Sequence, residues 1–165
     1  MSEATGASVE VEILVHKGPG EMWDLITDVG RIGDWSPECA GAAWLDGGSA
    51  WPGARFEGHN DFGGAFKATV TCVVTEAERP AVFEWIVLDP SNAVDRPGSV
   101  WRYELSPGDG AGQTKVLHRF VHGPGLTGLS RAMAGRPDQA ATILQDRLDQ
   151  LRKHMTITIE AMAAS

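Results

Sequence analysis

Cysteine is scarce in this sequence of 165 residues, which contains only Cys39 and Cys72. The two cysteines fall in different predicted strands and form no C-x-x-C pair. Neither a disulfide framework nor a zinc site is therefore indicated. We expect both thiols to be small buried hydrophobic groups.

Basic residues are also few, with 14 Lys and Arg against 22 Asp and Glu and a formal charge of −8. An acidic chain without basic runs repels a phosphate backbone, so nucleic acid is not an expected partner. No stretch approaches the roughly 18 consecutive apolar residues that a membrane span needs, and the N-terminus lacks a signal-peptide pattern. We expect a cytoplasmic protein without a membrane span.

Motifs for nucleophiles, phosphates and metals are missing as well. The sequence has no G-x-S-x-G elbow and no Gly-rich phosphate loop of either common spacing. His59, Asp61 and His122 suggest a metal site, but His59 and Asp61 should face away from the side of the strand that carries Asn60, and no spacing fixes a third ligand. We therefore expect neither a metal nor another cofactor.

Alternating apolar residues are the main signal that is present. Val9, Val11, Ile13 and Val15 follow the period of two that is typical of a half-buried strand. Further segments of strand length are separated by short turns rich in Gly, Pro, Asp and Asn, which predicts an antiparallel meander. The seven strands are expected at residues 9–15, 40–45, 54–60, 66–75, 82–88, 100–105 and 114–122.

Helical patterns occur at two places. A short helix is predicted at residues 21–29, with a second turn of chain before Trp35, and residues 123–135 are expected to be a lid-like loop with one helical turn. From Pro137 to about Met162, apolar residues recur every three or four positions and predict one long helix, with Arg147 and Lys153 on its solvent side. That apolar row comprises Leu144, Leu148, Leu151, Met155, Ile159 and Met162.

The order of strand, two short helices, six strands and long terminal helix resembles the START-like, helix-grip (SRPBCC) superfamily. Within it, the chain is similar to the bacterial polyketide cyclase/dehydrase and lipid-transport type. The residues that carry the resemblance are 11–16, 21–25, Asp28, Trp35-Ser36-Pro37, 52–56 and 58–60.

The resemblance implies an α+β fold in which a seven-stranded curved antiparallel sheet wraps around the C-terminal helix. Residues 9–162 would form one ligand-binding domain after a flexible N-terminus at residues 1–8. The implied partner is a small hydrophobic ligand, and both a monomer and a homodimer stay open.

In such a fold, alternate residues of each strand face the cavity between sheet and helix. The side chains expected to contact a ligand are Trp35, Phe56, Phe83, Trp85, Trp101, Phe120, Leu144, Leu148, Leu151 and Met155. Simple core packing is the alternative role for the aromatic residues of this set.

Three polar residues share the expected inner face and are the candidates for catalysis. His118 could move a proton near neutral pH, while Asn60 and Tyr103 could hydrogen bond to a carbonyl or enolate oxygen. A hydrogen-bonded core histidine and a strand-ending asparagine are the alternatives. Two functions follow: an enzyme that cyclises or dehydrates a polyketide-like substrate, or a non-catalytic carrier or sensor of a hydrophobic metabolite.

Overall fold

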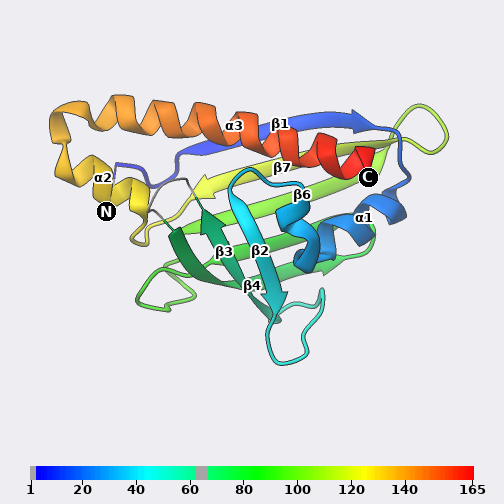
Figure 1. Cartoon of the computed structure of the whole chain (residues 1–165), viewed down its shortest axis with the longest axis horizontal. Coiled ribbons are helices and arrows are strands. Elements are labelled where there is room, and N and C mark those ends of the chain that lie inside the picture. The colour runs from blue at the N-terminus through cyan, green and yellow to red at the C-terminus, as the bar shows by residue number, and fades with distance from the viewer. Residues whose placement is uncertain (1–2, 62–66) are drawn as a thin grey trace.

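The computed structural model describes residues 3–61 and 67–165, and these form one curved sheet held against a long helix (Figure 1). The sheet has seven antiparallel strands in the order β1-β7-β6-β5-β4-β3-β2, which confirms the predicted fold class. The strands are β1 (Ser8–Val15), β2 (Cys39–Trp44), β3 (Arg55–Asp61), β4 (Lys67–Glu78), β5 (Val82–Val87), β6 (Ser99–Pro107) and β7 (Thr114–His122). The predicted start of the fourth strand, Phe66, lies outside the described residues.

Two short helices follow β1, as predicted. The first, α1 (Pro19–Thr27), ends two residues earlier than expected, and the 3-10 helix η1 (Val29–Asp34) continues the chain. The change occurs at Asp28, whose backbone N–H bonds to the Leu25 carbonyl in a tighter turn. Gly33 allows η1 to lie directly on β2, because a Cβ there would stand 2.2 Å from the Ala40 carbonyl oxygen.

The segment expected to be a loop contains a helix, α2 (Gly128–Gly135). Thr127 caps it, since its side-chain oxygen accepts a hydrogen bond from the Ser130 backbone N–H at 3.1 Å. The sequence pattern predicted only one helical turn in this segment, because the glycines at both ends of α2 are typical of loops. A short 3-10 turn, η2 (Pro137–Gln139), then leads into the C-terminal helix α3 (Ala140–Ala164).

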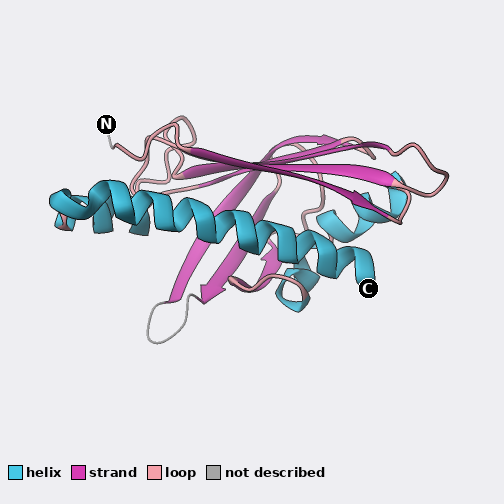
Figure 2. Cartoon of the chain, turned by 90° about the horizontal axis from the view of Figure 1, so that it is seen from above, coloured by secondary structure: helices cyan, strands magenta, loops and turns pink. Residues whose placement is uncertain are grey.

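Helix α3 runs alongside β1 (Figure 1), and Figure 2 shows the β2–β4 end of the sheet bending away from the direction of β1 and β7. Beside β1, the Arg152 guanidinium donates to the Glu10 carbonyl oxygen at 2.9 Å. The apolar row of α3 packs into the main core from Leu148 onward, whereas Leu144 packs near α2. Among the most buried side chains of this core are Met22, Phe83, Val116, Leu151, Ile159 and Met162.

The N-terminal residues that the structure describes are part of this fold. Ala4 is fully buried against the α2–α3 region. Gly6 and Ala7 exchange backbone hydrogen bonds with His122 at the end of β7. These contacts extend the β1–β7 edge toward the N-terminus, and the flexibility expected for residues 1–8 stays a prediction.

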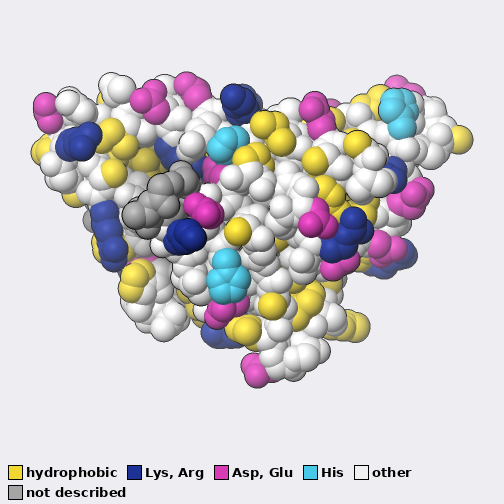
Figure 3. Space-filling view, in the orientation of Figure 1, with side chains coloured by type: hydrophobic (Ala, Val, Ile, Leu, Met, Phe, Trp, Pro, Cys, Tyr) yellow, Lys and Arg dark blue, Asp and Glu magenta, His cyan; other side chains and the backbone are white. Residues whose placement is uncertain are grey.

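Charged side chains are mixed on the molecular surface. Acidic, basic and hydrophobic groups are interspersed over the face seen in Figure 3. None of the helices in the described part of the chain combines the length and the hydropathy needed to span a bilayer.

Candidate functional site

A cavity of about 990 Å³ lies between the concave face of the sheet and α3. Its sheet side is dominated by aromatic rings that come from β3, β5, β6 and β7. We call these rings the aromatic wall: Phe56, Phe83, Trp85, Trp101, Tyr103, His118 and Phe120. The strand alternation thus predicted correctly which side chains face inward.

Antiparallel pairing brings the rings of the aromatic wall together. Phe83 lies opposite Tyr103 in the β5–β6 pair, and Tyr103 lies opposite His118 in the β6–β7 pair. One step along, Trp85 lies opposite Trp101, and their rings are nearly parallel with centroids 6.2 Å apart. Successive inward positions on three neighbouring strands therefore form one continuous aromatic surface.

Three residues predicted to contact a ligand lie elsewhere. Trp35 is buried in the core beside η1, Leu144 packs toward α2, and Leu148 packs against the main core. None of the three is among the described residues that line the cavity. Leu144 misses the cavity because the first turns of α3 pack against α2, whereas Trp35 and Leu148 are part of the packed core and not of the cavity wall.

Leu151 and Met155 of α3 do line the cavity, together with Met162 near the end of the helix. The ligand contacts predicted for these residues and for the aromatic wall stay predictions, since they rest on the position of the side chains alone.

His118 and Tyr103 form a stacked pair inside the cavity. Their ring planes differ by 4°, and the centroids are 3.7 Å apart. His118 Nδ1 lies 2.9 Å from the Arg102 carbonyl oxygen, which can only accept, so Nδ1 carries the hydrogen and Nε2 has a free lone pair.

The other polar atoms of this pair face the cavity. Neither His118 Nε2 nor Tyr103 Oη has a hydrogen-bond partner among the described residues. In this part of the chain, every fully buried side-chain nitrogen or oxygen atom does have a partner. Both atoms therefore border open space in the cavity, although the residues are only 4% and 3% exposed.

Burial sets the protonation of both rings. It lowers the pKa of His118 to about 4, against a smaller opposing effect of the hydrogen bond to Arg102. It also raises the pKa of Tyr103 far above its ordinary value. At neutral pH the cavity therefore presents a bare imidazole nitrogen as a proton acceptor and a phenol as a hydrogen-bond donor.

Asn60, the third catalytic candidate, lines the same cavity from the end of β3. No described residue hydrogen bonds to its side-chain amide. His59, its neighbour, points to the outer face, where it contacts Thr69 and Glu57. The strand thus separates these two side chains as predicted.

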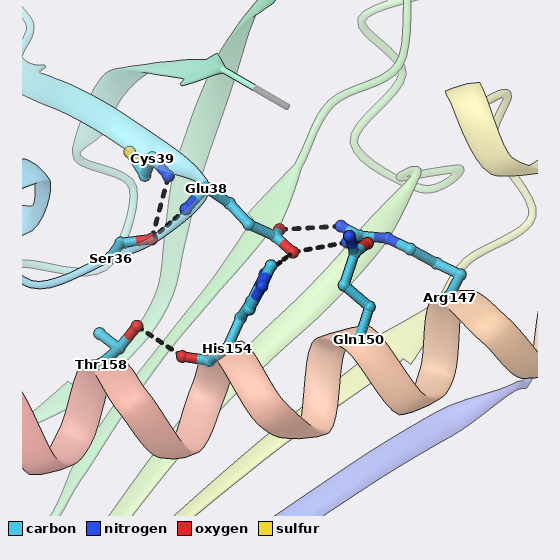
Figure 4. Close-up of polar contacts among 7 residues, drawn as sticks. All are labelled: Ser36, Glu38, Cys39, Arg147, Gln150, His154 and Thr158. Atoms are coloured by element: carbon cyan, nitrogen blue, oxygen red, sulfur yellow. Dashed lines mark hydrogen bonds and ion pairs between the residues drawn. The ribbon is translucent and has the colours of Figure 1, made fainter. Parts of the chain in front are cut away.

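A group of charged and polar side chains lies across the cavity, and the sequence analysis did not anticipate it. This Glu38 cluster consists of Glu38, just before β2, and Arg147, Gln150 and His154 on α3 (Figure 4). Arg147 donates to both oxygens of Glu38, at 2.5 and 2.9 Å. His154 Nδ1 lies 2.7 Å from Glu38 Oε2, and Gln150 Oε1 accepts from Arg147.

The backbone around Glu38 is fixed by a local turn. Ser36 Oγ accepts hydrogen bonds from the Glu38 and Cys39 backbone N–H groups at 3.1 and 2.9 Å. This turn aims the carboxylate at α3 (Figure 4). The predicted solvent-facing position of Arg147 is therefore wrong, because its side chain turns to Glu38 at the cavity and is only 22% exposed.

Glu38 is ionised in this setting. Burial acts to raise the pKa of Glu38, but the hydrogen bond and charge of Arg147, together with the hydrogen bond to His154, outweigh burial and hold the pKa below its ordinary value. The side chains of Glu38 and Arg147 are only 14% and 22% exposed, so this ion pair is screened less than a surface pair.

The thiols have no comparable activation. Burial raises the pKa of both Cys39 and Cys72, which keeps them protonated. Both are free cysteines, and both line the cavity. Cys72 is buried as expected, whereas Cys39 at the start of β2 is only partly so.

Comparison with solved structures finds the same fold in aromatase/cyclases. The Zhui aromatase/cyclase from Streptomyces sp. R1128 is 18% identical, with a TM-score of 0.69 over 96% of this chain and 92% of that one. The di-domain aromatase/cyclase StfQ from the steffimycin biosynthetic pathway is 8% identical, with a TM-score of 0.73 over 99% of this chain and 51% of StfQ.

A third similar structure is the Polyketide_cyc-like protein Cgl2372 from Corynebacterium glutamicum. It is 21% identical and has a TM-score of 0.66 over 94% of this chain and 88% of that one. At these identities the likeness establishes the fold. The search among curated proteins finds no significant match.

The sequence itself matches a family model over residues 6–156, which covers the strands, the cavity and most of α3. The description of that family is polyketide cyclase / dehydrase and lipid transport. This match agrees with the resemblance seen in the order of elements and with the helix-grip architecture. The chain belongs to the polyketide cyclase / dehydrase and lipid transport family.

Proposed function

We propose that the chain binds a polyketide-like or other aromatic ketone in its cavity and catalyses ring closure or loss of water by moving protons. The observation that carries this proposal is the stacked His118–Tyr103 pair, whose Nε2 and Oη atoms face the cavity without a protein partner. A purely structural pair in a core would satisfy these atoms within the protein. The family and the aromatase/cyclase folds support the same reaction class.

The chemistry follows from the protonation states of the two rings. His118 Nε2 removes a proton from a carbon flanked by carbonyl groups, and the electron pair of that C–H bond becomes an enolate. Tyr103 Oη donates a hydrogen bond to the enolate oxygen, as an oxyanion-stabilising group does. Asn60 offers a second hydrogen-bond donor, its side-chain amide, for another carbonyl of the same ligand.

Ring closure then needs no further reagent. The enolate carbon forms a bond to a second carbonyl carbon, and the π electrons of that carbonyl move to its oxygen. The resulting alkoxide takes the proton back from His118, whose low pKa makes its protonated form a ready donor. The aromatic wall contributes mainly by holding the two reacting carbons close together.

The cavity also supports a second function, that of a non-catalytic carrier or sensor of a hydrophobic metabolite. The extent of the aromatic wall favours this alternative, because carriage needs apolar surface and no proton donor. The two functions differ in what they require of His118. Catalysis depends on the Nε2 lone pair, whereas carriage depends only on the shape of the ring.

A cyclisation assay separates them. Wild-type protein is incubated with a phenyl-substituted 1,3,5,7-tetraketone, in which C2 lies between two carbonyl groups and can close a six-membered ring on C7, and cyclised product is followed by liquid chromatography. We expect His118→Gln to lower the rate by about 100-fold and Tyr103→Phe to lower it less. His59→Gln, which changes a histidine on the outer face, is the matched control.

Equal product formation by wild type and His118→Gln would rule out proton transfer by this residue. Native mass spectrometry of protein purified from its source would then identify the bound metabolite, and an intact, unconverted ligand would support carriage.

A further inference from the structure

The Glu38 cluster separates two cavities. On one side is the cavity with the aromatic wall, and on the other is a smaller cavity of about 420 Å³ between η1, β2 and α3. Glu38, Gln150 and His154 line both of them, as do Ser36 and Cys39. Polar groups at such a partition therefore border both cavities.

Within this partition, His154 has the geometry of a carboxylate-backed imidazole. Its Nδ1 lies 2.7 Å from Glu38 Oε2, and an ionised carboxylate can only accept, so Nδ1 carries the hydrogen. No described residue hydrogen bonds to Nε2. The ring therefore has one nitrogen held by Glu38 and the other free to gain or lose a proton.

Arg147 makes this geometry rigid. It binds both oxygens of Glu38 in the two-pronged manner of guanidinium and carboxylate, and Gln150 bonds to Arg147 in turn. The positive charge of Arg147 offsets the negative charge of Glu38, so the carboxylate stays ionised although its side chain is only 14% exposed. A hydrogen-bonded, charge-balanced support of this kind orients a histidine for proton transfer.

We propose that His154 is a second proton-transfer residue of the cavity, with Glu38 as its positioning residue, and that it passes protons between a ligand and the smaller polar cavity. The proposal rests on the proposed function, because it needs a ligand with an acidic C–H or O–H group. It narrows that ligand to ketones and phenols whose acidic group lies near α3 while their rings lie against the aromatic wall.

The proposed proton transfer has two steps. Nε2 of His154 takes a proton from the ligand, whose bonding pair becomes an enolate or phenolate, and the ring becomes an imidazolium in contact with Glu38. The imidazolium then loses the same proton to water in the smaller cavity. The reverse sequence delivers a proton to the ligand, so His118 and His154 serve two ends of one substrate.

The tautomer of His154 provides a test that needs no substrate. In ¹⁵N spectra recorded where the ring is neutral, with His154→Gln used to assign the signals, we expect His154 to carry its hydrogen on Nδ1. The Glu38→Ala variant should revert to the Nε2–H form that free imidazoles of histidine prefer. A predominant Nε2–H form in the wild type would overturn the proposal.

The activity test uses 2-tetralone, a bicyclic ketone with acidic C–H bonds, whose exchange with D₂O is followed by proton NMR. Binding is measured separately through quenching of tryptophan fluorescence. We expect His154→Gln to slow exchange by about 100-fold while the dissociation constant stays within about twofold. Glu38→Gln should cause a smaller loss of rate, and His59→Gln should exchange at the wild-type rate.

The outcomes distinguish the two proposals. Exchange that is lost in His118→Gln but unchanged in His154→Gln would overturn the role of His154 and leave the proposed function intact. Wild-type protein that binds 2-tetralone without accelerating its exchange would overturn both. If His154→Gln loses exchange and binding together, the residue has only a binding or structural role, and the proposal is wrong.

Discussion

The imidazole of His118 lies flat against the phenol of Tyr103 and hydrogen bonds through Nδ1 to the carbonyl of Arg102, the residue just before Tyr103. Two adjacent residues of β6 thus hold the ring, one through its side chain and one through its backbone. This arrangement fixes both the tautomer of His118 and the direction of its free nitrogen, and it gives the protein a measurable pH dependence.

Replacing His118 by phenylalanine should remove a pH-dependent loss of stability. Its pKa is lowered from 6.5 to about 4 in the folded protein, so below about pH 6.5 only the unfolded state takes up this proton. Stability from this residue is therefore complete at high pH and falls as the pH drops. Between about pH 7.5 and pH 5 the wild type should lose about 2 kcal/mol from this source.

Urea unfolding of wild type and His118→Phe at both pH values measures this difference. His122, whose pKa is also lowered by burial, is present in both proteins and cancels in the comparison. Glu38 has a lowered pKa and changes charge only under more acid conditions. Equal slopes for the two proteins would mean that His118 accepts a proton in the folded state as easily as in the unfolded one.

Replacing Arg147 by methionine should destabilise the protein by about 1–3 kcal/mol, because Glu38 then keeps a partly buried charge without its main counterion. The double variant Arg147→Met/Glu38→Gln should recover most of the loss. Urea unfolding at neutral pH measures both. Arg79→Met is the matched control, since the Arg79–Asp24 pair is exposed and should contribute less than about 1 kcal/mol.

Trp101 should contribute to ligand binding as part of the aromatic wall. Its ring lies nearly parallel to that of Trp85, and its indole N–H is already bound to Ser99 Oγ at 3.1 Å. We expect Trp101→Leu to weaken binding of 2-naphthol by about 3- to 10-fold, the effect of one lost aromatic contact. Isothermal titration calorimetry measures the change.

Trp51 supplies the control for this measurement, because it is 71% exposed and lies outside the residues that line the cavity. Trp51→Leu should bind 2-naphthol as the wild type does. If both tryptophan variants lose affinity equally, the probe binds outside the cavity.

Gly33→Ala should destabilise the protein by about 1–3 kcal/mol, since the added Cβ would meet the Ala40 carbonyl oxygen at 2.2 Å. The clash pushes η1 away from β2 and moves the turn that aims Glu38. Thermal unfolding followed by circular dichroism measures the loss. The control is Gly41→Ala on β2, next to Ala40. Its added Cβ would have nothing within 4 Å, so this variant should unfold near the wild-type temperature.

The sequence predicted the sheet side of the cavity well because strand periodicity is a local property. Once Val116, His118 and Phe120 alternate with polar residues, their common face follows, and antiparallel pairing places Tyr103 beside His118. The free state of their polar atoms could not be predicted. That state depends on the absence of partners from distant parts of the chain.

The Glu38 cluster escaped prediction for a different reason. Glu38 and Arg147 are 109 positions apart, and Glu38 lies in a turn that has no periodic pattern. A weak signal does exist in α3, where Arg147, Gln150, His154 and Thr158 repeat every three or four residues beside the apolar row. Such a polar row predicts a solvent-facing side of a helix, and the sequence does not show that a cavity lies beneath it.

Helix α3 therefore carries two separate rows, an apolar one that closes the core and a polar one that supplies charge to the cavity. Variation at Leu151, Met155 and Ile159 would alter how tightly the space between the curved sheet and the helix is filled, whereas variation at Gln150 and His154 would change which polar groups of a ligand the cavity can accept. An engineer, or natural selection, can thus retune the chemistry of this protein and its folding from a single helix by changing one row at a time.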